Sequence, residues 1–169
     1  LLAHMRSLVG ATLRPTTIRV LLLGKEASGK TALTALLKRN AKSTSARHEN
    51  VSTDGIAITA VKSALGVERG GEQMLTLLLY DFGGQPVFFP SHEFFLSPRC
   101  VALVVVDLSR PDVARTSHWL ERLSRLSPVK VILVGTHSDQ CADAEQALNS
   151  LHRAALHRYA TRIHSHCIV

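Results

Sequence analysis

The fold is decided by the stretch Gly24-Lys25-Glu26-Ala27-Ser28-Gly29-Lys30-Thr31, which has the pattern G-x-x-x-x-G-K-T. It follows the apolar run 18–23 and precedes a helical pattern with leucines at positions 33, 36 and 37. Strand, glycine-bounded loop and helix are the context of a phosphate-binding P-loop, the alternative being a chance match on a glycine turn. Backbone N–H groups and the start of the helix form an anion site there, because glycine lets the backbone approach closely. We expect Lys30 to reach the β- and γ-phosphates of a nucleotide and the Thr31 hydroxyl to bind Mg²⁺.

Buried-strand and helix patterns alternate along the rest of the chain. Apolar or alternating runs predict strands over 18–23, 56–61, 74–80, 101–106, 129–134 and 163–169. Helical patterns cover 30–40, 112–126 and 142–159, with Trp119 expected in the core, and a short irregular helix is expected over 87–96. The glycine-rich segment 65–71 predicts a hairpin turn, so the strands beside it are antiparallel. The predicted fold is α/β: a P-loop NTPase with a mixed six-stranded sheet, one antiparallel edge strand and helices on both faces.

Composition places the chain among globular proteins with one domain. It has 169 residues, of which 46% are hydrophobic and 20% charged, enough for a single core. The net charge is +7, but aromatic residues make up only 5% and no basic stripe alternates with them. We interpret the charge as a solvated surface, with no nucleic-acid partner and membrane contact that is peripheral at most. No apolar run is long enough to span a bilayer, and no secretory signal is recognised.

The cysteines and histidines do not predict a metal centre. The three cysteines, Cys100, Cys141 and Cys167, lack metal-ligand spacing and indicate reduced thiols in a cytoplasmic protein. Of the nine histidines, His164 and His166 form the closest pair, but no third ligand lies at a suitable spacing. Histidines on the surface or at strand ends are the favoured interpretation.

Two further loops carry groups suited to the γ-phosphate and to Mg²⁺. Thr53, in Ser52-Thr53-Asp54-Gly55, can bind Mg²⁺ through its side chain and the γ-phosphate through its backbone N–H. Asp81 follows the strand 74–80 and begins Asp81-Phe82-Gly83-Gly84-Gln85. Its carboxylate suits Mg²⁺ held through water, the Gly84 N–H can approach the γ-phosphate, and Gln85 can orient the attacking water. The alternative for Asp81 is an ordinary turn residue at the end of a strand.

The loop after the strand 129–134 decides which base is bound. This loop reads Gly135-Thr136-His137-Ser138-Asp139. Guanine presents two donors on one edge, N1–H and the exocyclic amine, and the Asp139 carboxylate can accept both. Adenine presents an acceptor at its N1 and would leave the carboxylate unpaired, which is costly. We expect His137 to stack on the purine and Thr136 to brace the loop; the alternative is an ordinary loop.

Taken together, these motifs resemble the Roc domain, the Ras-like GTPase module of the Roco proteins. The resemblance rests on 24–31, 53–56, 81–85 and 134–139, where T-H-x-D replaces the more usual N-K-x-D. The segment Ser91-His92-Glu93-Phe94-Phe95-Leu96 is also similar to the one that Roc domains carry after switch II. The resemblance covers roughly 18–169, and the ordered combination is specific although each piece alone is not.

The resemblance implies roles for individual residues. Thr53 is the switch I threonine, switch II contains Asp81, Gly84 and Gln85, and Lys30 and Gln85 are the catalytic residues. The metal ligands are Thr31, Thr53 and Asp81, and the implied cofactors are GTP or GDP with Mg²⁺. The nucleotide-binding set is Gly24, Lys25, Glu26, Ala27, Ser28, Gly29, Lys30, Thr31, Ala32, Thr53, Asp81, Gly84, Thr136, His137 and Asp139.

The resemblance also implies a larger protein. Roc domains usually follow leucine-rich or ankyrin repeats and precede a COR dimerisation domain. We expect residues 1–17 to be a lead-in helix and linker from a preceding domain, and 18–169 to be the Roc-like GTPase domain, cut before its last guanine-contact motif. The expected partners are a guanine nucleotide and the neighbouring repeat and COR-type domains, with homodimer formation left open.

Three departures from the family pattern indicate slow turnover. The last guanine-contact motif is not reached, Glu26 and Ala27 replace glycines common in Ras-like P-loops, and Pro86 restricts the backbone at Gln85. The predicted function is a GTP-binding switch with slow, Mg-dependent hydrolysis in a larger signalling protein. Two alternatives stay open: an ATP-using P-loop enzyme such as a small kinase, and a non-catalytic nucleotide-binding or dimerisation scaffold.

Overall fold

The structure, a computed structural model, describes residues 17–40, 55–67, 71–83, 95, 100–125, 129–159 and 163–169. The strands are β1 (Thr17–Leu23), β2 (Ile56–Val67), β3 (Gly71–Phe82), β4 (Cys100–Asp107), β5 (Lys130–Thr136) and β6 (Ile163–Ile168). The helices are α2 (Lys30–Asn40), α4 (Val113–Ser124), α5 (Ala144–Tyr159) and the short 3₁₀ helix η3 (Ser138–Gln140). The predicted helix at 1–10, and the predicted helix 87–96 except for Phe95, lie outside the described residues.

The strands form one six-stranded sheet in the order β2-β3-β1-β4-β5-β6. Every neighbouring pair is parallel except β2 and β3, which pair antiparallel from Ile56↔Phe82 to Val67↔Gly71. A short connection can only return a strand antiparallel, whereas parallel neighbours need a crossover. The predicted mixed sheet with one antiparallel edge strand is therefore confirmed.

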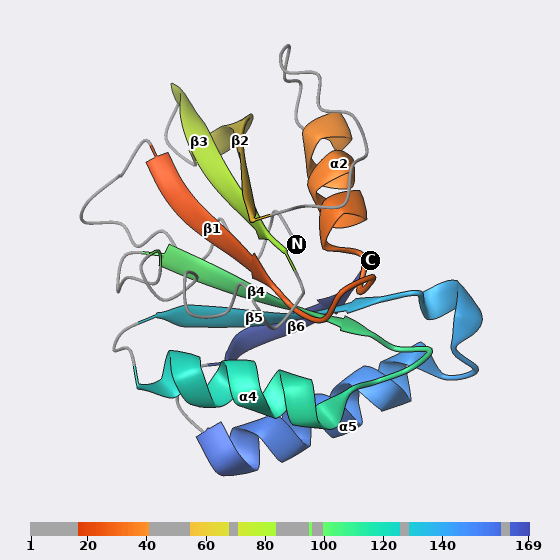
Figure 1. Cartoon of the computed structure of the whole chain (residues 1–169). Helices are drawn as coiled ribbons and strands as arrows, with labels where there is room; N and C mark the ends of the chain where they lie inside the picture. The colour runs from red at the N-terminus through yellow and green to blue at the C-terminus, as the bar shows by residue number, and fades with distance from the viewer. Residues whose placement is uncertain are drawn as a thin grey trace.

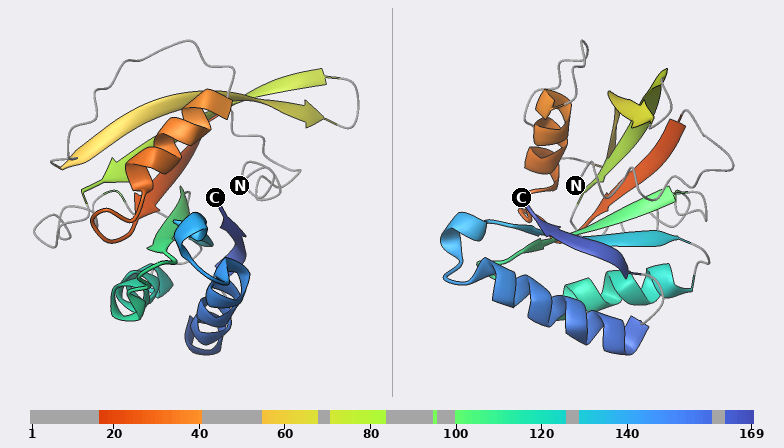
Figure 2. Two further views of the ribbon diagram at one scale, coloured as in Figure 1. Left: turned by 90° about the vertical axis from the view of Figure 1, so that its right-hand side faces the viewer. Right: turned by 180° about the vertical axis from the view of Figure 1, so that it is seen from behind.

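Helices cover both faces of the sheet, as predicted. Helix α2 lies on one face, and α4 and α5 lie side by side on the other (Figures 1 and 2). Among the helices that the structure describes, none combines the length and the apolar character needed to cross a membrane.

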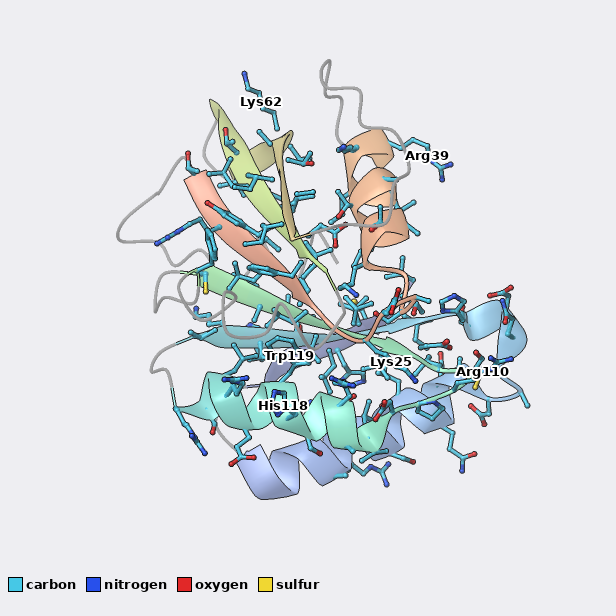
Figure 3. The ribbon with its side chains drawn as sticks, viewed as in Figure 1. Lys25, Arg39, Lys62, Arg110, His118 and Trp119 are labelled. Carbon is cyan, nitrogen blue, oxygen red and sulfur yellow. The ribbon has the colours of Figure 1, made fainter. Side chains whose placement is uncertain are left out.

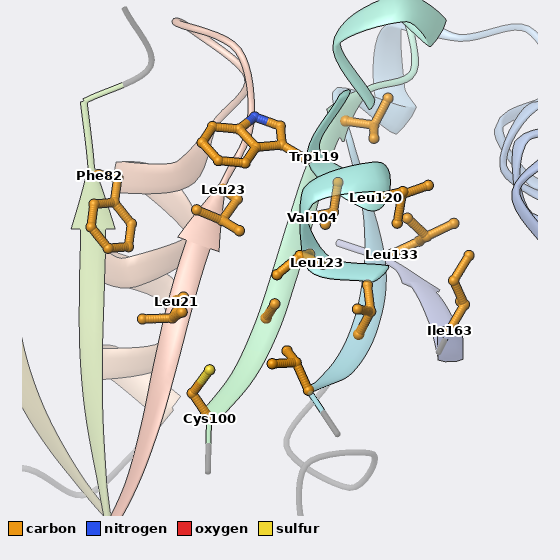
Figure 4. Packing of buried hydrophobic residues seen from close by; sticks show 14 of the residues in the cluster. Leu21, Leu23, Phe82, Cys100, Val104, Trp119, Leu120, Leu123, Leu133 and Ile163 are labelled. Carbon is orange, nitrogen blue, oxygen red and sulfur yellow. The ribbon is translucent and has the colours of Figure 1, made fainter. Parts of the chain in front are cut away.

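The central strands are buried on both sides, and the core is therefore divided in two. Successive side chains of a strand point to opposite faces, so Leu21 and Leu23 of β1 join the cluster under α4 and α5, while Val20 and Leu22 join the cluster under α2. Trp119 of α4 is 1% exposed and lies among Leu23, Leu120 and Phe82 in the first cluster (Figure 4). Its predicted packing role is confirmed, and this core fixes α4 beneath the end of β4.

The predicted bounds of the hairpin turn and of α5 are wrong. Segment 65–71 was expected to be a turn, but β2 continues to Val67 and β3 begins at Gly71, because the antiparallel ladder outlasts the apolar pattern that marked its centre. Helix α5 begins at Ala144 rather than at 142, since the Asp143 side chain accepts a hydrogen bond from the Gln146 N–H at 2.8 Å and caps the helix.

Candidate functional site

Four strand ends meet at one edge of the sheet. In parallel strands the carboxyl ends share an edge, and ligands of open α/β sheets bind there. The register places Leu22 beside Asp81 and Asp107 beside Thr136. Four parts of the chain are therefore neighbours: the P-loop after β1, the acidic ends of β3 and β4, and the loop after β5. The sequence predicted this for the P-loop, the end of β3 and the loop after β5, but not for the end of β4.

The P-loop 24–29 turns tightly between β1 and α2. A Cβ at Gly24 would lie 2.4 Å from the Val105 carbonyl oxygen, so only glycine fits against β4 there. Gly29 has φ +87°, and Ala27 adopts the left-handed conformation with φ +59°. This conformation is unfavourable for a residue with a Cβ, so the loop carries local strain at Ala27.

Lys30 is held across the base of the P-loop. Its side chain donates to the carbonyl oxygens of Gly24 at 3.1 Å and Lys25 at 2.6 Å, and the residue is 6% exposed. Burial lowers the pKa of Lys30, while the charges of Asp81 and Glu26 oppose that shift. An ammonium group has three protons, so two stabilise the loop and one is left to meet a phosphate.

Thr31 and Asp81 form the best candidate for a magnesium site among the described residues. The Thr31 hydroxyl donates to Asp81 Oδ2 at 2.6 Å, and Asp81 is 3% exposed. Asp81 Oδ1 is buried without a hydrogen-bond partner among the described residues. Burial raises the pKa of Asp81, against the opposing effects of the Thr31 hydrogen bond and the Lys30 charge. A buried carboxylate oxygen left unpaired beside a hydroxyl is the oxygen donor set that Mg²⁺ takes, so these residues fit the ion.

The loop after β5 is fastened to the P-loop. The Thr136 hydroxyl donates to the Ser28 carbonyl oxygen at 2.8 Å, and the Val106 carbonyl oxygen lies 3.2 Å away from it. The predicted bracing role of Thr136 thus has a direct physical basis in the P-loop itself. His137 follows with φ +54° and η3 begins after it, placing Asp139 on the exposed surface.

Asp107 lies beside His137 at the end of β4. His137 Nδ1 is 3.6 Å from Asp107 Oδ1. Asp107 was not predicted as a site residue, although it is a carboxylate at the end of a buried strand, as Asp81 is.

Lys25 and Asp112 link the P-loop to α4. Lys25 Nζ lies 3.7 Å from Asp112 Oδ2, while Asp112 Oδ1 accepts from the Arg115 N–H at 2.9 Å and caps the helix. A cavity of about 210 Å³ opens between the P-loop, the end of β4 and α4, with Lys25 and Arg110 near the N-terminal end of α4 and Trp119 further along it (Figure 3). The contact between Lys25 and Asp112 was not predicted from the sequence either.

The structure brings part of the predicted site together. Residues 24–32, Asp81, Thr136 and His137 lie along one edge, and Asp139 lies close by in η3. Thr53, Gly84 and Gln85 lie outside the described residues, so their predicted roles stay predictions.

Comparison with known proteins connects this arrangement to one family. The sequence model described as "Ras of Complex, Roc, domain of DAPkinase" matches residues 19–139. Over 152 residues the chain is 32% identical to the probable serine/threonine-protein kinase pats1 of Dictyostelium discoideum, a match that covers 82% of this chain and 5% of that protein. It is 28% identical over 148 residues to the leucine-rich repeat serine/threonine-protein kinase 1 of Caenorhabditis elegans, covering 84% of this chain and 6% of that protein.

A solved structure shares the fold. The Roco2 RocCORdC of Methanosarcina barkeri, bound to GDP, superposes with a TM-score of 0.64 at 23% identity and covers 92% of this chain and 43% of that chain. In each comparison the chain spans less than half of its relative's length.

Proposed function

This chain belongs to the Roc family, and from that premise we propose that it is a guanine-nucleotide switch domain, binding GTP with Mg²⁺ and hydrolysing it slowly to GDP. The observation that carries the proposal is the 2.8 Å hydrogen bond from Thr136 to the Ser28 carbonyl oxygen. It fastens a loop suited to a base against a loop suited to phosphates, and a nucleotide is the ligand with both parts.

At the phosphate end, the backbone of residues 24–29 supplies N–H donors, and the start of α2 adds its positive dipole end. Lys30 places one N–H and a positive charge beside this cradle. These groups favour the charge that develops on the phosphates during transfer, because they are fixed before the nucleotide arrives.

Mg²⁺ would be held by Thr31 and by Asp81, with Thr53 as the further ligand that the family resemblance implies. When bound, Mg²⁺ neutralises charge on the β- and γ-phosphate oxygens. Asp81 Oδ1 is buried and has no hydrogen-bond partner among the residues that the structure describes, which supports this assignment, since such a carboxylate oxygen is costly unless something binds it.

At the base end, Asp139 would accept both donors of the guanine edge, with His137 beside the purine. The exposed position of Asp139 leaves its carboxylate accessible to a ligand. The GDP bound to the similar Roco2 structure supports guanine as the base.

Hydrolysis would depend on Gln85 to orient water. Slow turnover is proposed because Pro86 follows Gln85 directly and Glu26 places a carboxylate in the P-loop. We further propose that the chain works inside a larger cytoplasmic signalling protein of the Roco type, with repeat and COR-type domains as neighbours and a homodimer as one mode of assembly.

The test is binding of fluorescent GDP, GTP and ATP to the chain, with and without Mg²⁺. We expect guanine nucleotides to bind much more tightly than ATP, and Asp139→Asn to remove most of that preference. The matched control is Glu145→Gln, an exposed acid of α5, which should leave it intact. ATP binding equal to GTP binding would favour an ATP-using enzyme. Guanine binding without turnover, unchanged by Gln85→Leu, would favour a non-catalytic scaffold.

A further inference from the structure

The ring of His137 has two polar neighbours on one side. Its Nδ1 lies 3.2 Å from the Thr136 hydroxyl oxygen and 3.6 Å from Asp107 Oδ1. His137 itself adopts the left-handed conformation, with φ +54°, which histidine tolerates better than most residues. The backbone conformation and the two neighbours together set the direction in which the ring points.

The proton positions around His137 follow from counting donors. The Thr136 hydroxyl has one hydrogen, and its shortest contact, 2.8 Å, is to the Ser28 carbonyl oxygen, which can only accept. Toward His137 the Thr136 oxygen must therefore accept, which requires a hydrogen on Nδ1. An ionised Asp107 is also an acceptor only. Both neighbours thus call for the same proton on the same nitrogen.

Asp107 is well fixed for this task. Its Oδ1 accepts hydrogen bonds from the Ser109 N–H at 2.9 Å, the Ser109 hydroxyl at 2.6 Å and the Arg110 N–H at 3.3 Å. Burial alone would raise the pKa of Asp107, but the Ser109 hydrogen bonds, together with the charge of His137 and the Arg110 N–H, lower it overall. The carboxylate is therefore ionised at neutral pH and cannot swing away from the end of β4 without breaking the turn that follows.

We propose that Asp107 is the positioning residue for His137: it holds the ring as the Nδ1–H tautomer, so that Nε2 on the far side is a hydrogen-bond acceptor for an O–H or N–H group of the bound nucleotide. This inference rests on the proposed nucleotide-binding function for its ligand. It gives His137, in the loop after β5, a role as a hydrogen-bond acceptor of fixed direction in addition to stacking. It also connects the end of β4 to base recognition through a residue that does not itself meet the base.

The first test reads the tautomer without any nucleotide. Ring ¹⁵N shifts distinguish a protonated nitrogen from a bare one, and the His137 signal is identified as the one lost in His137→Asn. At about pH 8 we expect Nδ1–H in the parent chain. Asp107→Asn should lower the fraction of the Nδ1–H tautomer, because the amide oxygen that still accepts from Ser109 and Arg110 is neutral and attracts the Nδ1 proton less strongly than a carboxylate. Glu121→Gln, an equal loss of charge on the exposed surface of α4, should change nothing. Nε2–H in the parent, or an unchanged tautomer in Asp107→Asn, overturns the proposal.

The second test is a double-mutant cycle on GDP affinity. Asp107→Asn alone should weaken binding roughly 3- to 10-fold, the effect of losing one hydrogen-bonding partner. In the His137→Asn background, where asparagine also tolerates the left-handed backbone, the same change should have almost no effect. Additive losses mean that Asp107 does not act through His137 and refute the proposal. If the parent chain binds no guanine nucleotide, the proposed function fails, whereas the tautomer measurement still decides the role of Asp107 toward His137.

Discussion

The Thr31 hydroxyl and the Asp81 carboxylate are 50 residues apart in the sequence and 2.6 Å apart in the structure. The contact joins the first turn of α2 to the end of β3, so that one short bond connects two neighbouring ligands of the proposed Mg²⁺ site. The other oxygen of this carboxylate, Asp81 Oδ1, is buried and has no hydrogen-bond partner among the described residues.

We predict that Asp81→Asn uncouples nucleotide retention from Mg²⁺. In the parent chain, Mg²⁺ should slow the release of labelled GDP. In the variant, the factor by which Mg²⁺ slows GDP release should be smaller by roughly tenfold or more, as for other changes in the surroundings of a metal. The measurement is the GDP release rate with Mg²⁺ and with a chelator. Glu121→Gln, an exposed carboxylate of α4, is the control, and an equal Mg²⁺ effect in both variants would contradict the assignment.

Ala27→Gly should stabilise the chain. Ala27 has φ +59°, where a Cβ is unfavourable, and glycine removes that strain at a smaller entropic cost. We expect the free energy of unfolding to rise by about 0.5–1 kcal/mol. The same substitution at Ala35, exposed in the middle of α2, should lower it by about 0.5–1 kcal/mol. Urea denaturation of the two variants without nucleotide measures this difference, and a shift of the same sign in both would show that Ala27 is not strained.

Gly24→Ala should be strongly destabilising, because the added Cβ would lie 2.4 Å from the Val105 carbonyl oxygen, a backbone atom that cannot turn aside. Gly55 offers a comparison: it has φ +91°, but a Cβ there meets nothing within 4 Å. Both variants bear backbone strain, and only Gly24→Ala adds a collision, so it should lose about 1–3 kcal/mol more. Thermal and urea unfolding measure the two losses side by side. Equal losses would mean that β4 moves away from the P-loop without cost.

Stability should fall in mild acid because of His152. Its ring lies 4.2 Å from that of His166, between α5 and β6. Burial, and then the charge of His166, lower the pKa of His152 below its ordinary value of 6.5. The unfolded chain therefore binds the proton more readily, and the free energy of unfolding decreases as the pH falls through about 6.5, levelling off below the lowered pKa.

The measurement for His152 is urea unfolding across this pH range. His152→Gln should reduce the decrease in the free energy of unfolding toward acid pH. His164→Gln, at an exposed residue of β6, should leave the dependence of this free energy on pH unchanged. Identical curves for the two variants would rule out the pair of rings as a source of the acid sensitivity.

The elements of the fold that depend on local pattern were predictable. The strands β1, β4 and β5 are continuous apolar runs because both faces are covered, and the P-loop carries its glycines in a fixed spacing. The hairpin strands were predicted too short, since β2 and β3 also pair through residues such as Lys62 and Gln73 that carry no apolar signal.

Part of the site could not be predicted because its partners are backbone atoms. The Ser28 carbonyl that receives the Thr136 hydrogen bond lies 108 residues earlier, and any residue type could supply it. The left-handed conformations of Ala27 and His137 are likewise invisible, because neither residue type demands them. Asp107 was visible in the sequence as a carboxylate at a strand end, but its importance depends on the position of His137.

The bond between Thr136 and Ser28 also has a thermodynamic consequence for the ligand. The two loops lose their relative freedom when the chain folds rather than when a nucleotide arrives, so association carries a smaller entropic penalty. A purine that docks in one loop thereby raises the effective concentration of its own phosphates at the other. Guanosine and pyrophosphate offered separately should bind far more weakly than their joined form. A substitution of Thr136 should affect the binding of both the base and the phosphates.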